Sequence, residues 1–428
     1  MDVLPLRLAD ASRLAEVSPP DPPAKANLAG LDAVRGFAAL GVVLLHSCAP
    51  YLLRPMPGLA WSMRDTSSPA VDFCFWSIEV FIMPLFLVMA GFFAWQSLSR
   101  RGEIKLIKSR AKRLLLPLLF GILVILPLDL YCWVLGWVTE GLIAPVKLKS
   151  LKFDGGIDRD LWGLSHLWFL QYLFLYVVSL AIAYRIRKRF TAIQRVRITP
   201  KLATALILLA GTLTLYVRPE VVWGFQHAFL PVPSKWIYSG MFFAFGSCLA
   251  AHDGSISWLK SHAGRLLGPA IALLIATVFL GQWQVGGGEG KLAGITLAGL
   301  TSGSALLTTL TILGVAVARI KRIPTSVQYL AAASFWVYLV HHPILGLIHI
   351  DLKWLLPELS PLIKTVASFA LSTLLSLVTY EVFVRRTFLG RWLGFQWEFP
   401  VEQKSTEQEI QSISIGKIES AVLSRRAA

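Results

Sequence analysis

The stretch "LDAVRGFAALGVVLLHSCAPYLL" (Leu31–Leu53) is apolar over almost all of its length and is long enough to cross a bilayer as one helix. It nevertheless contains three ionisable residues, Asp32, Arg35 and His46. A charged side chain at the centre of a bilayer costs ~2.5–3.5 kcal/mol on insertion scales. Ionisable residues in such a segment therefore indicate either a position close to one membrane face or a function inside the protein.

The rest of the chain has the same apolar character. Of its 428 residues, 55% are hydrophobic and 15% are charged, whereas a soluble chain carries about 25% charged residues. Long apolar runs alternate with short basic connections, which is typical of an all-α, polytopic membrane protein. We predict about ten spanning helices, near residues 31–53, 71–98, 114–138, 166–184, 202–217, 236–251, 266–284, 291–318, 328–349 and 365–388.

The charge of the connections predicts the orientation. Residues 99–113 and 185–201 each contain seven Lys or Arg, with one acidic residue and none, respectively, whereas residues 139–165 contain four basic and four acidic residues. Because basic loops stay in the cytoplasm, this alternation places both termini there. The formal charge of +16 then reflects topology and contact with anionic membrane lipids, and we expect no binding to nucleic acid.

The same pattern predicts three parts: a cytoplasmic N-terminal segment (1–30), a ten-helix membrane domain (31–390) and a cytoplasmic C-terminal tail (391–428). The first segment does not read as a cleavable signal peptide, because acidic residues and prolines interrupt any apolar core. The four cysteines are scattered singly, without metal-ligand spacing. We therefore expect no metal and no tightly bound cofactor.

The predicted orientation places His46 at depth in the membrane. Arg35 lies near the cytoplasmic face, and His46 is eleven residues further along, or ~16 Å at the rise of an α-helix. One interpretation is that His46 only hydrogen-bonds a neighbouring helix. The other is that its neutral imidazole serves as a general base for an attacking hydroxyl.

The segment "RAKRLLLP" precedes the third predicted helix and places Arg110 and Arg113 three residues apart. The pair lies on one face if the helix begins early. It is explained either as ordinary charge on the cytoplasmic side or as a binding site, since guanidinium groups are preferred partners of phosphates. A phosphorylated cytosolic donor such as a CoA thioester would suit this pair.

Further ionisable residues lie in the predicted outer half of the helices: Glu79, Asp129, His166, His341 and His342. Neighbouring Trp168 is typical of the aromatic belt at the membrane interface. Adjacent helical residues point about 100° apart, so at most one of His341 and His342 is expected to face a shared cavity. Glu79 and the three histidines are our candidates for the acceptor side of a reaction.

Together these residues could form a polar route through an apolar bundle, and two classes of function use such a route. One is a transferase whose donor comes from the cytosol and whose acceptor is met near the other face. The other is a transporter or flippase of a carbohydrate or acyl compound, with the same groups acting as a relay.

Several motifs carry a resemblance to a known family over about residues 28–390. They are "LDAVRGFAALGVVLLH" with its Arg-x10-His spacing, "RAKRLLLP" with its paired arginines, "PLFLVMAGFF", "SHLWFL", "SFWVYLVHHPI" and "YEVFVRR". With these motifs in this order, the chain resembles the membrane acyltransferase-3 family. Within that family it is similar to the branch of the osmoregulated periplasmic glucan biosynthesis protein C.

The resemblance implies a function and roles for four residues. His46 would be the essential catalytic histidine, Arg35 would stabilise the reacting groups or the donor, and Arg110 with Arg113 would hold the acyl donor. The branch implies transfer of a succinyl group from succinyl-CoA to hydroxyls of a periplasmic glucan, in the inner membrane of a bacterium. Within the same class, an acetyltransferase acting on another cell-surface polysaccharide is the alternative.

The sequence departs from the family pattern at one position. Ala90 stands where many relatives have a serine before Gly91. A hydroxyl at this position therefore has no part in the function of this chain, whereas close packing at Gly91 is still expected.

Overall fold

The computed structural model describes residues 29–150, 162–190, 198–253 and 256–395. Within these ranges the chain is helical, with no β-strand, as the sequence predicts. The predicted N-terminal segment and C-terminal tail lie almost entirely outside the described residues, so their boundaries stay a prediction.

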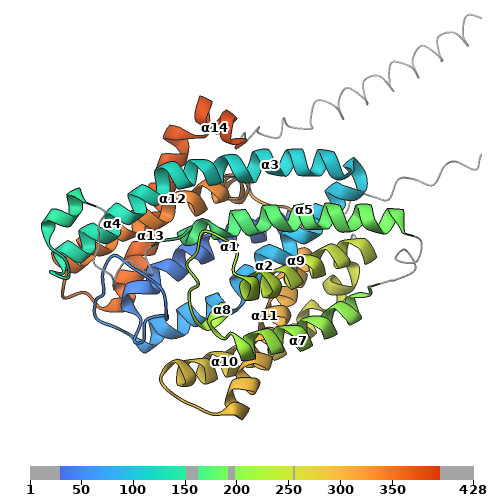
Figure 1. Ribbon diagram of the computed structural model, residues 1–428, viewed down its shortest axis with the longest axis horizontal. Helices are drawn as coiled ribbons and strands as arrows, with labels where there is room; N and C mark the ends of the chain where they lie inside the picture. The colour runs from blue at the N-terminus through green and yellow to red at the C-terminus, as the bar shows by residue number, and fades with distance from the viewer. Residues whose placement is uncertain (1–28, 151–161, 191–197, 254–255, 396–428) are drawn as a thin grey trace, which may run out of the picture. The chain divides into compact units, whose positions relative to one another are not determined.

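The main helices follow each other along the chain (Figure 1). They are α1 (Ala29–Cys48), α2 (Pro69–Arg101), α3 (Glu103–Phe120), a π-helical turn η3 (Gly121–Ile125), α4 (Leu126–Thr139), α5 (Trp168–Arg189), α7 (Pro200–Val217), α8 (Glu220–Trp223), α9 (Pro233–His252), α10 (Ser257–Val285), α11 (Lys291–Arg319), α12 (Thr325–Leu355), α13 (Pro361–Phe383) and α14 (Phe388–Leu393). Short 3₁₀ turns occur at Ala49–Tyr51, Pro145–Lys149 and Ser165–Leu167.

Nine helical segments of the described chain are long and apolar enough to cross a membrane. They coincide with nine of the ten predicted spans. The remaining predicted span, 236–251, is present as α9 but is not one of the nine. The protein is therefore an all-helical, multi-pass membrane protein.

The start predicted for the third span is wrong. The helix begins at Glu103 rather than at residue 114, directly after Gly102, and continues through η3 to Thr139. Gly102 has a φ of 77°, a conformation that favours glycine and ends α2. The following Lys, Leu, Ala and Arg residues are good helix formers. The basic segment is consequently helix, and not a loop.

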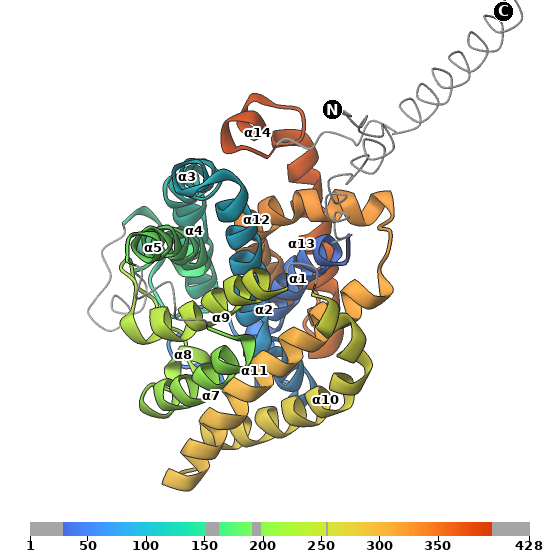
Figure 2. The same cartoon turned by 90° about the vertical axis from the view of Figure 1, so that its right-hand side faces the viewer.

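The chain forms two compact units, and the boundary between them lies between Leu377 and Val378. In the first unit, α1 packs against α2, α11 and α12, while α2 packs against α9 and α10 against α11 (Figures 1 and 2). Of the apolar window of α12, 78% is buried inside the protein, against 22% for α10. The histidines of α12, His341, His342 and His349, are accordingly buried among other helices.

A pair of glycines allows α2 and α9 to approach closely. A Cβ atom on Gly91 would lie 1.9 Å from the carbonyl oxygen of Phe243, and one on Gly246 would lie 2.0 Å from that of Val88. Small residues at helix contacts are the usual means of close packing in membranes. The hydroxyl of Ser247 donates to the carbonyl of Gly91 at 3.0 Å. Gly91 thus has the expected packing role, and a serine on α9 contacts it although residue 90 is alanine.

The connection between α1 and α2 folds back into the bundle. Asp65 forms a buried ion pair with Lys364 of α13, at 2.7 Å. Further back in the same connection, the backbone carbonyl of Trp61 accepts a hydrogen bond from the indole of Trp137, at 2.9 Å. These contacts place the indole ring of Trp61 next to histidines of α1 and α12, where it forms part of the site described below.

In the second unit, Arg385 pairs with Glu381 one turn earlier, at 2.8 Å. The side chain of Thr387 accepts a hydrogen bond from the backbone N–H of Gly390 at the start of α14. This is an N-cap of the kind that begins many helices.

Candidate active site

His46 stands two residues before the end of α1, and its ring is held in one orientation. Its Nδ1 lies 3.0 Å from the backbone carbonyl of Val42 and 3.1 Å from Nε2 of His341. A carbonyl only accepts hydrogen bonds, so Nδ1 of the neutral ring carries the proton. Nε2 of His46 is therefore unprotonated, which is the form that a general base requires.

His341 of α12 supports this assignment. Its Nδ1 lies 2.8 Å from the carbonyl of Tyr338 and 3.1 Å from that of Val337, so this nitrogen is also a donor. Its Nε2 is then left to accept the hydrogen bond from His46. His341 is fully buried and lies against His46, without lining the cavity that His46 faces.

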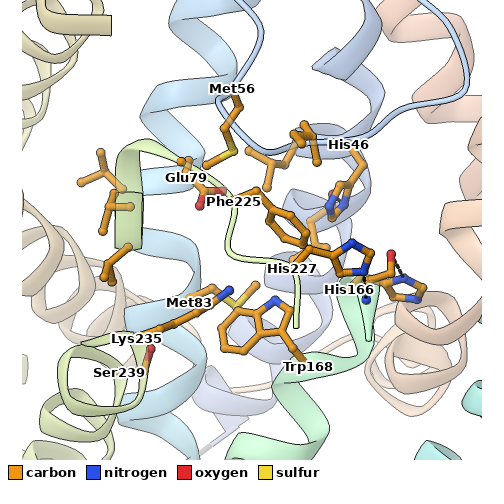
Figure 3. A pocket seen from close by; sticks show the side chains of 18 of the residues that line it. His46, Met56, Glu79, Met83, His166, Trp168, Phe225, His227, Lys235 and Ser239 are labelled. Atoms are coloured by element: carbon orange, nitrogen blue, oxygen red, sulfur yellow. Dashed lines mark hydrogen bonds between the residues drawn. The ribbon is translucent and has the colours of Figure 1, made fainter. Parts of the chain in front are cut away.

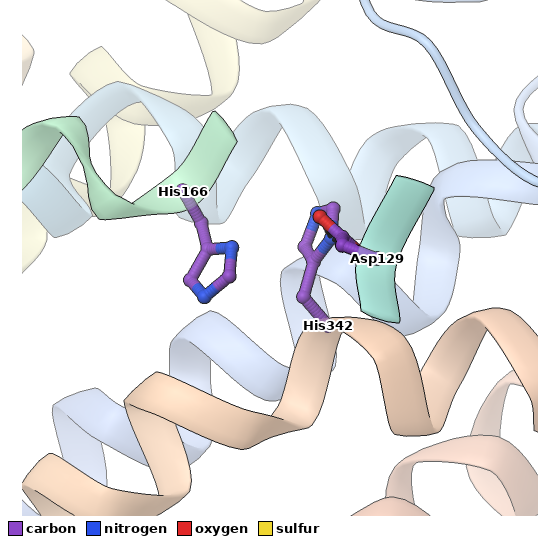
Figure 4. Close-up of side chains that lie close together, drawn as sticks. All are labelled: Asp129, His166 and His342. Carbon is purple, nitrogen blue, oxygen red and sulfur yellow. Dashed lines mark hydrogen bonds and ion pairs between the residues drawn. The ribbon is translucent and has the colours of Figure 1, made fainter. Parts of the chain in front are cut away.

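His342 lines that cavity and is joined to a buried carboxylate (Figure 4). Its Nδ1 lies 2.7 and 2.8 Å from the two oxygens of Asp129 on α4. The hydroxyl of Ser165 donates to Asp129 at 3.0 Å. A carboxylate in this position holds an imidazole in the tautomer with the proton on Nδ1 and stabilises it when it becomes charged. Of the two adjacent histidines, His342 lines this cavity and His341 does not.

His166, from the 3₁₀ turn before α5, lies beside His342. The two rings are stacked with centroids 4.7 Å apart, and Nε2 of His166 donates to the carbonyl of Leu339 at 3.1 Å. The hydroxyl of Tyr338 donates to the backbone carbonyl of His166. His166 is therefore held on both its ring and its backbone.

Three of these residues have the chemistry of metal ligands. Potential ligand atoms of Asp129, His166 and His342 lie within 4.8 Å of one another. However, Asp129 and His342 are bonded to each other, and Nε2 of His166 is engaged by a carbonyl. An ion would have to replace these hydrogen bonds, so the observed geometry fits a hydrogen-bonded network better than a metal centre.

A cavity lies next to this cluster (Figure 3). The polar and ionisable side chains that line it include His46, Glu79, Ser165, His166, Trp168, His227, Lys235, Tyr238, Ser239, Tyr338 and His342. They come from α1, α2, α5, α9, α12 and the connections before α5 and α9. The cavity therefore collects three of the four acceptor-side candidates, Glu79, His166 and His342, around the ring of His46.

The arginines lie away from this cavity. Arg110 is half-buried, and Arg113, Arg101 and Arg35 are close enough to act on it electrostatically. Arg35 is also paired with Asp32 at 3.3 Å and its side chain is 49% exposed. Since Arg35 and His46 are about 16 Å apart along α1, Arg35 belongs with the other arginines rather than with the histidines. A concentration of guanidinium groups suits an anionic ligand.

Sequence reasoning missed several residues of the site. Lys235 and His227, which line the cavity, were not singled out. Ser165 and Trp61, whose ring packs against His46 and His342, were not singled out either. The clue for Lys235 is a basic residue in a connection that the charge pattern places outside the cell. Trp168, interpreted as part of an aromatic belt, instead lines the cavity with the ammonium of Lys235 over its ring.

Comparison with known proteins decides between the classes of function. A model of the acyltransferase-3 family, described as an acyltransferase domain, matches residues 28–381. The chain belongs to this family. No curated protein and no solved structure matches it. As a member of the acyltransferase-3 family, the chain is a membrane O-acyltransferase. The matched region contains the histidine cluster (His46, His166, His341 and His342) and the arginine group (Arg35, Arg110 and Arg113). The transporter interpretation is not supported.

Proposed function

We propose that this acyltransferase moves an acyl group from a cytosolic acyl-CoA, succinyl-CoA in particular, to hydroxyl groups of a periplasmic glucan in the inner membrane of a bacterium. The acyl group, donor and acceptor rest on the motifs shared with the glucan branch. The observation that carries the proposal is the unprotonated Nε2 of His46 at a cavity inside the family's membrane domain.

The proposed reaction uses His46 as the general base. Its Nε2 takes the proton from a sugar hydroxyl while the hydroxyl oxygen attacks the carbonyl carbon of the thioester. The new C–O bond forms, the tetrahedral intermediate collapses, and the C–S bond breaks. The leaving thiolate takes the proton back from His46, which restores the enzyme. General base catalysis of this kind contributes about 10²–10⁴-fold.

His342 and Asp129 would assist on the acceptor side. The carboxylate keeps the proton on Nδ1 of His342, so that its Nε2 can accept a hydrogen bond from a sugar hydroxyl. Glu79, across the cavity, offers further acceptor oxygens. Such hydrogen bonds would orient one hydroxyl toward His46 and the thioester, and orientation alone lowers a barrier substantially.

The arginine group would bind the phosphates of CoA. In the proposed orientation Arg35, Arg110 and Arg113 lie at the cytoplasmic side, and Arg35 is about 16 Å from His46 along α1. The pantetheine arm would extend through this depth and bring the thioester to the cavity. A role for Arg35 in binding the donor is therefore favoured over direct stabilisation of the reacting carbonyl.

The proposal is tested with the purified protein in detergent, which removes the two compartments but keeps donor and acceptor in one solution. Succinyl-CoA, glucan and protein should release free thiol and yield glucan heavier by one succinyl unit for each site modified, as measured by mass spectrometry. If the folded protein releases no thiol with any acyl-CoA but moves a labelled compound across sealed vesicles, the proposal is wrong.

A further inference from the structure

Lys235, in the first turn of α9, is a buried ammonium group with no hydrogen-bond acceptor among the described residues. The residue is 6% exposed. Its Nζ lies 3.7 Å from the ring centroid of Trp168 and 5.1 Å from that of Phe225. No carboxylate of the described chain lies within 4.0 Å of it. Aromatic faces offset the free-energy cost of burying a charge only in part. An anionic ligand that binds the ammonium would offset the rest.

The side chain reaches into the cavity that contains His46 (Figure 3). One other charged group lines this cavity among the described residues, the carboxylate of Glu79. It acts on Lys235 electrostatically but is too far away for an ion pair. The ammonium is therefore left available to a ligand group in the cavity.

The position of Lys235 narrows the choice of anion. The phosphates of a CoA donor would be held by Arg35 and Arg110, and the thioester would lie near His46. Any charge carried at the free end of the acyl chain lies beyond the thioester, on the side away from the phosphates. Lys235 and Trp168 line the same cavity as His46 and can meet such a charge there.

We propose that Lys235, seated over Trp168, binds a carboxylate at the free end of the transferred acyl group. The donor is then the monothioester of a dicarboxylic acid. This inference rests on the proposed acyl-CoA-dependent transfer. It adds a subsite that selects the acyl group, and it distinguishes a succinyl donor from the neutral acetyl donor of the alternative function.

The subsite selects between acyl groups because the ammonium of Lys235 needs a charged partner. A dicarboxylic acyl group gives Lys235 a charged acceptor, whereas a neutral acyl group leaves it buried without one. A site built to bind a polar group rejects an analogue that lacks this group much more strongly than it rejects a change of one methylene. The subsite should therefore discriminate by charge rather than by length.

The test compares two donors with the full-length protein in detergent. Succinyl-CoA and butyryl-CoA have acyl chains of equal length, which end in a carboxylate and in a methyl group, respectively. The wild type should show kcat/KM about 10²-fold or more higher for succinyl-CoA. Equal values for the two donors would overturn the subsite and leave the transferase intact. Release of thiol from neither donor would overturn the proposed function itself.

Variants locate the discrimination at Lys235. In Lys235→Met the ratio of kcat/KM for the two donors should fall toward one, and in Lys235→Arg it should be partly kept. Lys260→Met, an exposed lysine on α10, is the matched control and should keep the wild-type ratio. Glu79→Gln removes the other charge of the cavity and should keep the ratio or raise it. A ratio unchanged in Lys235→Met, or lost equally in Glu79→Gln, would contradict the assignment.

Discussion

Nε2 of His341 lies 3.1 Å from Nδ1 of His46, and this hydrogen bond joins the histidine of α1 to the most buried of the spanning helices, α12. With the bond to the carbonyl of Val42, it holds the proton on Nδ1 of His46, whose ring lines the cavity. In the proposed mechanism His46 is the base, and His341 acts on it as a positioning residue. These two roles predict different kinetic consequences.

Replacement of His46 by glutamine should abolish most of the acyl transfer. An amide cannot take the proton from the sugar hydroxyl, so kcat should fall by about 10²–10⁴-fold. Binding of acyl-CoA should change little, because its phosphates would be held about 16 Å away. The measurement is thiol release by detergent-solubilised protein, with half-buried His262→Gln on α10, outside the cavity, as the control. Robust turnover by His46→Gln would show that another group is the base.

Replacement of His341 by phenylalanine should lower kcat by roughly 10–100-fold with little effect on KM for the donor, because His46 loses its orientation. His341→Gln should recover part of the rate, since its carbonyl oxygen can accept the hydrogen bond from Nδ1 of His46. A purely structural role predicts equal damage in both variants. The comparison of kcat and KM for the two variants distinguishes these outcomes.

Replacement of Asp129 by asparagine should lower kcat/KM by about 10²-fold or more, because the amide no longer fixes the tautomer of His342. Ser165→Ala should have a smaller effect, since it removes one neutral hydrogen bond and leaves the bond to His342. Exposed Asp351→Asn serves as the control. Gel filtration of each variant checks folding, and wild-type kinetics in folded Asp129→Asn would refute the role.

The arginine group should act on the donor alone. Arg110→Ala and Arg113→Ala should raise KM for acyl-CoA about tenfold or more, since hydrogen bonds to charged groups contribute about 1.5–3 kcal/mol. Lysine at either position should restore little, because it lacks the fork that binds two phosphate oxygens. Arg322→Ala removes an exposed basic residue elsewhere and should leave KM unchanged. If both alanine variants acylate normally at limiting donor, these arginines serve only topology.

Chelation should leave the enzyme active. The carboxylate of Asp129 is hydrogen-bonded to Nδ1 of His342, and Nε2 of His166 is hydrogen-bonded to a backbone carbonyl. Dialysis against EDTA should therefore change neither thiol release nor thermal stability. Elemental analysis that finds one zinc per chain, together with a loss of stability on chelation that zinc reverses, would contradict this prediction.

Local composition was sufficient to predict most of the fold. The apolar runs predicted ten helices because membrane-spanning backbone must satisfy its own hydrogen bonds, and all ten are present as helices. The start of the third span was misplaced because hydropathy reports burial in lipid, whereas the basic residues before 114 form a helix by local propensity.

The candidate site was predictable only in part. His46, Glu79, His166 and His342 stood out because ionisable residues are costly in a membrane, and they line one cavity. Lys235 and Trp61 did not stand out. One lies at the end of an apolar segment and the other in a connection, where charge and aromatic rings are common.

The sequence by itself determined that the chain is helical and spans the membrane, and its motifs pointed to the acyltransferase-3 family, because these properties depend on hydropathy and short-range spacing. The tertiary structure alone decided which histidine meets which partner. His46 and His341 are almost 300 positions apart in the chain, and Asp129 and His342 are more than 200 positions apart. Their hydrogen bonds depend on how α1, α4 and α12 are rotated and packed, which no local pattern of residues fixes.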